Sequence, residues 1–175
     1  MNKVTIGVLA ALGPVYAVTA HSEVYMTEQK AAELLLKDEA FDKKAFELSA
    51  DDIKAIESDG IESVRAKNLN LFKGKQGSVV FIDQVLGKHE FITYATAVGA
   101  NGAVKGVEII EYRETYGHQV RKDSWRKQFV GKNKDSELKI DHDIANISGA
   151  TLSSVHITSG VKRLLKTYDV IKKRL

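Results

Sequence analysis

A run of small residues, Ser148-Gly149-Ala150-Thr151, leads directly into an apolar-periodic segment near the end of the 175-residue chain. Its backbone carries little side-chain bulk, and Thr151 adds a hydroxyl where we expect a helix to begin. Unpaired N–H groups and the positive end of the helix dipole meet at such a start, which favours phosphate binding. Gly149 would let a ligand approach closely. The run could therefore bind a phosphate beside a hydroxyl.

A simpler interpretation of the same run stays open. It could be a tight turn, with Ser153 or Ser154 capping the helix that follows. Phosphate sites at helix starts are much rarer than caps, so the physical chemistry of these residues alone favours the simpler interpretation.

The familiar catalytic and metal-binding sets are absent from the sequence. It has no cysteine, which excludes disulfides, thiolate metal sites and thiol nucleophiles. Its five histidines never fall at the i, i+3 or i, i+4 spacing of a helical metal site. His142, between Asp141 and Asp143, could bind a metal weakly, although a solvated loop is the simpler interpretation. We predict no catalytic residue and no metal ligand, so redox chemistry would need a bound cofactor.

Charge gives no reason to expect a nucleic-acid partner. The net charge is +3, and no aromatic-basic motif accompanies it. One basic cluster, made of Arg121, Lys122, Arg126 and Lys127, surrounds Trp125. It is either a docking face for an acidic redox partner or, more simply, a solvated surface over a buried indole.

The elements that must position these residues can be read from the hydrophobic pattern. Residues 78–86, 91–98 and 104–112 are rich in β-branched and aromatic residues, and Asn101-Gly102 marks a hairpin between the last two. They predict an antiparallel meander. A helix around 123–131 should follow, capped by Asp123 or Ser124 and ended by Gly131. In the final helix, apolar residues recur on one face, namely Val161, Leu164, Leu165, Tyr168 and Ile171.

The N-terminal part reads as helical. We predict a helix over 27–48 that starts at Thr27 and has its apolar residues on a helical period, namely Ala31, Ala32, Leu34, Leu35, Ala45 and Phe46. A second helix should run from Ser49 to Gly60. The prediction is a single α+β domain, an antiparallel sheet with flanking helices, in which a helical segment (21–73) precedes the main domain (74–175).

Residues 1–20 have the layout of a secretory signal. Lys3 precedes an uncharged, mostly apolar run from Val4 to Val18, and small residues end at Ala20. The alternative is a membrane-anchoring helix, but 15 residues interrupted by Gly13-Pro14 are short of the roughly 20 that a span needs. We predict cleavage near Ala20 and a periplasmic or otherwise extracytoplasmic protein.

The stretch SGATLSS, followed by an apolar helix, resembles the flavinylation motif of the FMN-binding domain family. That family includes the flavin-bearing subunits of the sodium-pumping NADH:quinone reductase and of the Rnf complex. In the family, a flavin transferase takes FMN from FAD and esterifies its phosphate to the threonine of the motif. The resemblance implies that Thr151 carries FMN. The residues that it places around the cofactor are Ser148, Gly149, Ala150, Leu152 and Ser153.

A second stretch, VEIIEYRETYGHQV, is similar to the family's strand and Glu-Thr-x-Gly loop, which packs against the flavin. It implies that Glu114, Thr115, Tyr116 and Gly117 line the cofactor. The order of strand, loop, helix, SGAT and helix also matches. Two positions depart from the family pattern: Ala145 stands where an Asp usually precedes the modified Thr by six residues, and Tyr116 stands where Pro is frequent.

The resemblance implies an exported electron-transfer flavoprotein that relays electrons between a membrane donor and an extracytoplasmic acceptor. Its partners would be the flavin transferase and membrane or exported redox proteins, with no nucleic acid. A pure relay needs no acid or base, so we expect electron transfer rather than substrate turnover. Two alternatives stay open: a non-covalent FMN-dependent reductase, in which His118 or Glu114 supplies protons, and a flavin-free periplasmic binding module.

Overall fold

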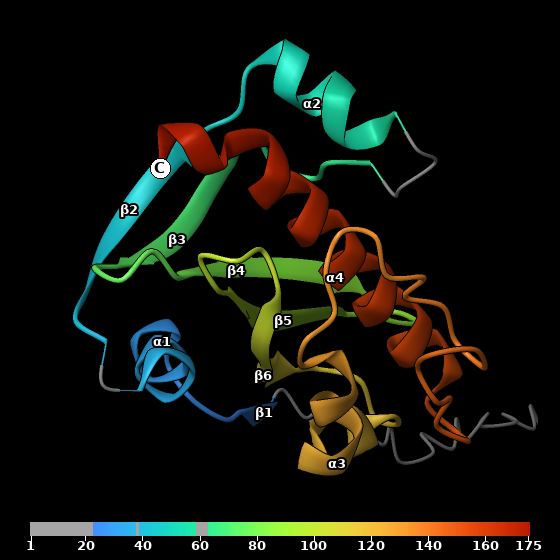
Figure 1. Cartoon of the computed structure of the whole chain (residues 1–175). Coiled ribbons are helices and arrows are strands. Elements are labelled where there is room, and N and C mark those ends of the chain that lie inside the picture. Colours follow the sequence, from blue (N-terminus) through green and yellow to red (C-terminus); the bar gives the residue numbers. More distant parts are fainter. Residues whose placement is uncertain (1–22, 38, 59–62) are drawn as a thin grey trace, which may run out of the picture.

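The computed structural model describes residues 23–37, 39–58 and 63–175. The predicted leader, its cleavage site and Gly60 lie outside these ranges. The described residues form one antiparallel sheet with the strand order β1-β6-β5-β4-β3-β2, and helices flank it (Figure 1). The predicted α+β class is therefore confirmed. No helix within these ranges has the length and apolar character needed to cross a bilayer.

The strands include the predicted meander. Its members are β4 (Val79–Leu86), β5 (Phe91–Val98) and β6 (Val104–Tyr112), each hydrogen-bonded to the next in antiparallel register. Gly102, with φ of 79°, makes the predicted turn between β5 and β6. The sheet also contains strands that we did not predict, which are β1 (Glu23–Val24), β2 (Phe41–Glu47) and β3 (Asn68–Gly74).

Two of the predicted helix starts are confirmed. Thr27 caps α1 (Glu28–Leu36) by accepting from Lys30 N at 3.1 Å, and Ser49 begins α2 (Ala50–Glu57) with a reciprocal capping box. The predicted cap of α3 (Asp123–Arg126) is wrong, because Lys122 occupies that position and no side chain caps the helix. The remaining helical elements are η1 (His118–Arg121), η2 (Lys127–Phe129), α4 (Thr151–Ile171) and η3 (Lys172–Arg174).

The predicted helix over 27–48 ends much earlier than we expected. It stops at Leu36, and Lys37 has a positive φ of 53° that ends the helical path. Residues 41–47 instead form β2, which pairs with β3 along its whole length. Most β2 side chains are exposed, so no apolar alternation marks them as a strand, and pairing with β3 decides their conformation. The described part of 21–73 thus contributes strands as well as helices.

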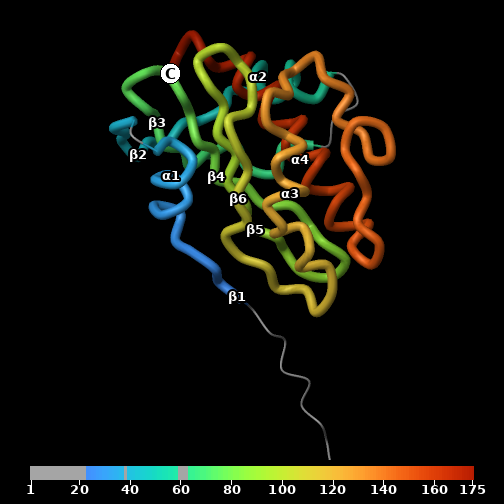
Figure 2. Tube along the Cα trace, turned by 60° about the horizontal axis from the view of Figure 1, so that its bottom comes forward, coloured from blue at the N-terminus to red at the C-terminus, as the bar shows by residue number. Residues whose placement is uncertain are grey.

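The sheet separates two apolar layers. Helix α4 covers one face and α1 the other, as Figures 1 and 2 show, and α2 packs on α4. The predicted apolar face of the final helix is confirmed, since all five of its residues are buried: Val161, Leu164, Leu165, Tyr168 and Ile171. This long, well-anchored helix fixes the position of its own first residue, Thr151.

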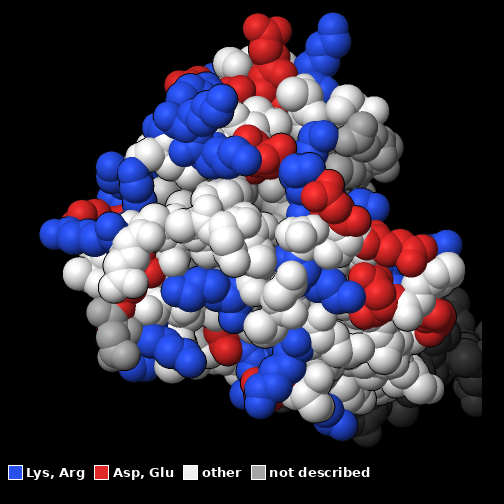
Figure 3. All heavy atoms as spheres, viewed as in Figure 1, with Lys and Arg blue, Asp and Glu red and all other residues white. Residues whose placement is uncertain are grey.

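Charged side chains of both signs are interspersed over the face shown in Figure 3. In the predicted basic cluster, Trp125 is buried and Arg126 forms an ion pair with Glu108. Lys127 pairs with Asp123 at 2.6 Å, and the Arg121 guanidinium lies 3.6 Å from the centre of the Tyr25 ring. These internal contacts favour the simpler interpretation, a solvated surface over a buried indole.

Candidate cofactor site

The two sequence motifs meet at one cavity of about 530 Å³. It lies between the start of α4, the loop after β6 and the turn between β4 and β5. Its lining residues are Lys88, His89, Glu114, Thr115, Tyr116, Gly149, Ala150, Thr151, Leu152 and Ser153. Eight of our ten predicted site residues are among them; Ser148 and Gly117 are not. The volume falls within the usual range for sites that hold a small molecule or cofactor.

The helix start in this cavity has no side-chain cap. Ala150 is the N-cap residue, and the first backbone bond into α4 runs from Ser154 N to Ala150 O at 2.9 Å. The alternative in which Ser153 or Ser154 caps α4 is wrong. Ser154 Oγ donates back to Ala150 O at 3.0 Å, and Ser153 Oγ lies 2.9 Å from the Tyr112 hydroxyl. The first N–H groups of a 21-residue helix thus remain available to an anion.

The turn before α4 leaves its backbone open. Gly149 has φ of 80°, and a methyl group added to it would meet no atom within 4 Å. Ala150 is buried and its carbonyl accepts both a backbone N–H and the Ser154 hydroxyl, which fixes the turn against the helix. Thr151, the next residue, is exposed. Its hydroxyl is accessible at the point where the helix dipole is positive.

The loop after β6 is locked to the helix start. The Tyr112 hydroxyl donates to Tyr116 O at 2.5 Å and, having one proton, must accept the Ser153 hydroxyl proton. Gly117 has φ of 100°, and a methyl group there would overlap the Tyr112 hydroxyl and lie 3.1 Å from Ser153 Oγ. The close approach requires glycine. The hydrogen bond from Tyr112 holds the backbone of Tyr116, and the residue is 81% exposed at the cavity.

The Glu114 carboxylate is used to hold the neighbouring turn. Its Oε1 accepts the backbone N–H groups of His89 at 2.5 Å and Glu90 at 3.0 Å. Partial burial raises the pKa of Glu114, but these backbone hydrogen bonds outweigh it, and the net pKa is below the usual value. A methyl group on Gly87 would lie 2.6 Å from the same oxygen. Glu114 is thus ionised and holds the 87–90 turn. We call these hydrogen bonds from His89 N and Glu90 N to Glu114 the Glu114 clamp.

The segment that leads to the motif is held on both sides of Ala145. Trp125 Nε1 donates to Ala145 O at 2.7 Å, and Ala145 N donates to Gln128 Oε1 at 2.8 Å. Asp143 accepts from Lys132 Nζ at 2.8 Å and from backbone N–H groups of its own loop. Burial raises the pKa of Asp143, but these hydrogen bonds and the nearby charge lower it to about 2. Asp143 is engaged in its loop, outside the cavity lining.

The possible metal site around His142 is not assembled. His142 Nδ1 lies 3.1 Å from Glu137 Oε1, and Asp143 is committed to Lys132. In the described ranges, no group of three His, Asp or Glu side chains is placed to hold a metal ion.

The motifs did not indicate Lys88 and His89, which come from the turn between β4 and β5. Their position follows from the register of the meander. Ile92 pairs with Tyr112, so the turn before β5 must lie beside the loop that follows β6. If the same register is assumed for the predicted strands 91–98 and 104–112, residues 87–90 fall next to Glu114.

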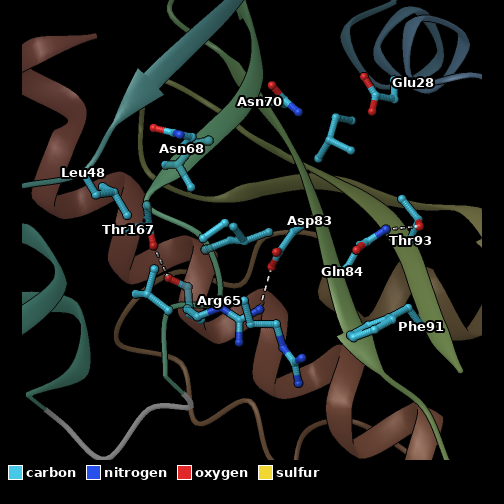
Figure 4. Close-up of a pocket in the computed structure, with 16 residues that line it drawn as sticks. Glu28, Leu48, Arg65, Asn68, Asn70, Asp83, Gln84, Phe91, Thr93 and Thr167 are labelled. Atoms are coloured by element: carbon cyan, nitrogen blue, oxygen red, sulfur yellow. Dashed lines mark hydrogen bonds and ion pairs between the residues drawn. The ribbon is translucent and has the colours of Figure 1, made fainter. Parts of the chain in front are cut away.

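A second cavity of about 490 Å³ lies where β3 stops pairing with β4. Two polar pairs lie within it: Gln84 Nε2 donates to Thr93 Oγ1 at 3.0 Å, as Figure 4 shows, and Asp83 forms an ion pair with Arg163 at 2.7 Å. Arg65 lies over the Phe91 ring. None of our predicted site residues lines this cavity. The cavity at the start of α4 is therefore the better candidate site.

Comparison with known proteins points to the same region. Residues 87–166 match the model of a family described as an FMN-binding domain. The chain is also 31% identical, over 87 residues, to one of the subunits of the Na⁺-translocating ferredoxin:NAD⁺ oxidoreductase complex of Acetobacterium woodii. That alignment covers 45% of this chain and 42% of the relative. The chain thus aligns with less than half of the relative's length.

Proposed function

We propose that this chain, whose residues 87–166 match the FMN-binding domain family, is an exported flavoprotein that carries FMN on Thr151 and relays electrons. The observation that carries the proposal is that the SGAT turn (residues 148–151) and the ETYG loop (residues 114–117) line one cavity. The residues of that cavity fit the cofactor chemically, because an uncapped helix start favours a phosphate and Tyr116 offers an aromatic side chain to a flavin ring.

Thr151 is the proposed point of attachment. Its exposed hydroxyl lies at the first residue of α4. In the covalent step the Thr151 oxygen would form a bond to the flavin-side phosphorus of FAD, while the bond from that phosphorus to AMP breaks and the hydroxyl proton is released. A flavin transferase would catalyse this exchange. The resulting phosphodiester keeps one negative charge, which the N–H groups at the helix start and its dipole would stabilise.

The loop residues 114–117 would form the other side of the site. Bound FMN supplies the electron-transfer chemistry, and the protein supplies position and electrostatics. Tyr116 presents an exposed aromatic face at the cavity, and Thr115 adds a hydroxyl. Gly117 and Ser153 both lie against the Tyr112 hydroxyl, which fixes the position of the loop relative to the helix. The residues of this chain bind and orient the cofactor, and no proton transfer from them is required.

The reductase alternative has less support. One proton donor that we considered, Glu114, is held ionised by backbone N–H groups. The other, His118, begins η1 and is not among the residues that line the cavity. Neither side chain is placed as an acid for a substrate in the described structure.

Export and partners belong to the same proposal. The signal-like N-terminus supports secretion, and a covalent bond would retain the flavin where dissociated cofactor cannot be recovered. The relative in Acetobacterium woodii is part of an oxidoreductase complex. We propose by analogy that a membrane redox protein donates electrons to this chain and that a membrane or extracytoplasmic protein accepts them.

Mass spectrometry of the full chain, co-expressed with a flavin transferase and exported, tests the attachment. We expect the mature protein to gain the mass of one FMN esterified with loss of water, and denaturation should not release the flavin. Thr151→Ala should abolish the gain. Ser58→Ala removes an exposed hydroxyl at the end of α2, outside this cavity, and should leave the gain unchanged. Wild-type protein without added mass would refute covalent attachment, and flavin released on denaturation would indicate the non-covalent alternative.

A further inference from the structure

The turn between β4 and β5 gives the cavity a positive charge that the two motifs do not supply. Among the described lining residues, Lys88 is the one lysine and there is no arginine. Lys88 is exposed, and the structure records no ion pair for it in the described part of the chain. The one carboxylate in the lining, Glu114, is next to it but already accepts N–H groups of the turn.

The clamp by Glu114 makes the turn a fixed wall instead of a free loop. Gly87 N donates to Glu90 O at 2.8 Å, which closes the turn across Lys88 and His89. Glu114 Oε1 then binds the N–H groups of His89 and Glu90 from outside. These hydrogen bonds together define where Lys88 leaves the main chain. These N–H groups stabilise the charged form of Glu114 and hold the carboxylate on the turn. Lys88 adds an ammonium group to this wall of the cavity.

Hydrogen bonds also connect the walls of the cavity to one another. Ser153, in the first turn of α4, contacts Tyr112, and Tyr112 holds the backbone of Tyr116. Glu114 belongs to the same loop as Tyr116 and reaches the 87–90 turn. The helix start and the turn are therefore opposite ends of one connected series, with the ETYG loop between them. The same cavity thus extends from Thr151 past that loop to Lys88.

We propose that Lys88, positioned by the Glu114 clamp, raises the reduction potential of the bound flavin. This inference rests on the proposed function. Two-electron reduction of a bound flavin by its donor, with uptake of one proton from water, would add one negative charge to the ring. A nearby ammonium favours that charge by Coulomb attraction, so the reduced form is stabilised relative to the oxidised form. The lysine neither gives up its proton nor changes its own bonds, and it acts as a fixed charge.

The test is a redox titration of the purified, FMN-loaded full chain, followed by flavin absorbance. In Lys88→Met we expect the ratio of reduced to oxidised flavin at a fixed ambient potential to fall about tenfold, which is about 30 mV for a two-electron couple. Lys88→Arg should retain the wild-type potential. Lys44→Met, on β2 at the far edge of the sheet, is the matched control and should also retain it.

Salt gives a second readout that a structural defect would not reproduce. The cavity is open to solvent, so the difference in potential between wild type and Lys88→Met should shrink as ionic strength rises. If Lys88→Met keeps the wild-type ratio within about twofold at low salt, the inference is overturned while the flavoprotein itself stands. If wild-type protein binds no flavin under these conditions, the proposed function fails and the inference fails with it.

Discussion

The hydroxyl groups of Tyr112 and Ser153 lie 2.9 Å apart, across 41 residues of sequence. Tyr112 ends β6, and Ser153 belongs to the first turn of α4. Both groups are buried, and Tyr112 also holds the backbone of Tyr116. One phenol therefore couples the position of the ETYG loop to that of the SGAT turn, and a cofactor that contacts both would depend on this coupling.

Tyr112→Phe should destabilise the protein by about 1–3 kcal/mol, because it leaves buried partners at Ser153 and Tyr116 without a hydrogen bond. Urea unfolding monitored by circular dichroism measures the free energy. Tyr168→Phe is the matched control, since its hydroxyl makes only a long 3.4 Å bond to Ala100 O, and it should cost less. Equal losses in the two variants would contradict the coupling that we describe.

Two glycines of the site should respond differently to alanine. Gly117→Ala adds a methyl group where the Tyr112 hydroxyl already lies and also strains a left-handed backbone, so we expect a loss of roughly 2–4 kcal/mol and reduced flavin attachment. Gly149→Ala meets only open space, so its cost should be limited to the backbone term of about 1–2 kcal/mol. Unfolding free energies of both variants give the comparison, and a smaller loss for Gly117→Ala would refute the packing argument.

The sequence predicted the part of the fold that has a strong local pattern. The meander and the buried face of α4 follow from alternation and helical period, and the two motifs identified eight of the cavity residues. The sequence missed β2, because its exposed residues acquire a strand conformation only by pairing with β3. It also missed Lys88 and His89, since no local signal marks them and only the register of the sheet brings them to Glu114. The sequence also did not reveal that α4 lacks a side-chain cap. Ser153 and Ser154, the predicted caps, bind Tyr112 and the Ala150 carbonyl instead.

Asp143 should make the protein sensitive to acid. Its pKa is about 2 in the folded chain, below the value of about 3.9 expected when unfolded. Its contribution is therefore complete above about pH 5 and is lost as the pH falls from about 4 toward 2. Because the side chain is partly solvated, we expect Asp143→Asn to cost roughly 1–2 kcal/mol at about pH 7 and much less near about pH 2.5. Urea unfolding at both pH values measures the difference, and an equal cost at the two would contradict the linkage.

Glu114→Gln should release the turn that carries Lys88 and His89. An amide is a weaker acceptor than a carboxylate, so the N–H groups of His89 and Glu90 should lose protection against hydrogen exchange, after correction for intrinsic rates. The pKa of Glu114 is lowered in the folded state, so in wild type the clamp is complete above the ordinary glutamic acid pKa of about 4.3 and weakens as pH falls through the lowered value.

Glu47→Gln serves as the control. Glu47 lies on the far edge strand β2, where it pairs with Lys67, and its replacement should leave both amides protected. Because the clamp acts on the 87–90 turn while α4 is anchored separately through Tyr112, the amides at the start of α4 should not change in Glu114→Gln. A simultaneous loss of protection at residues 151–154 would show that Glu114 stabilises the whole site and not the turn alone.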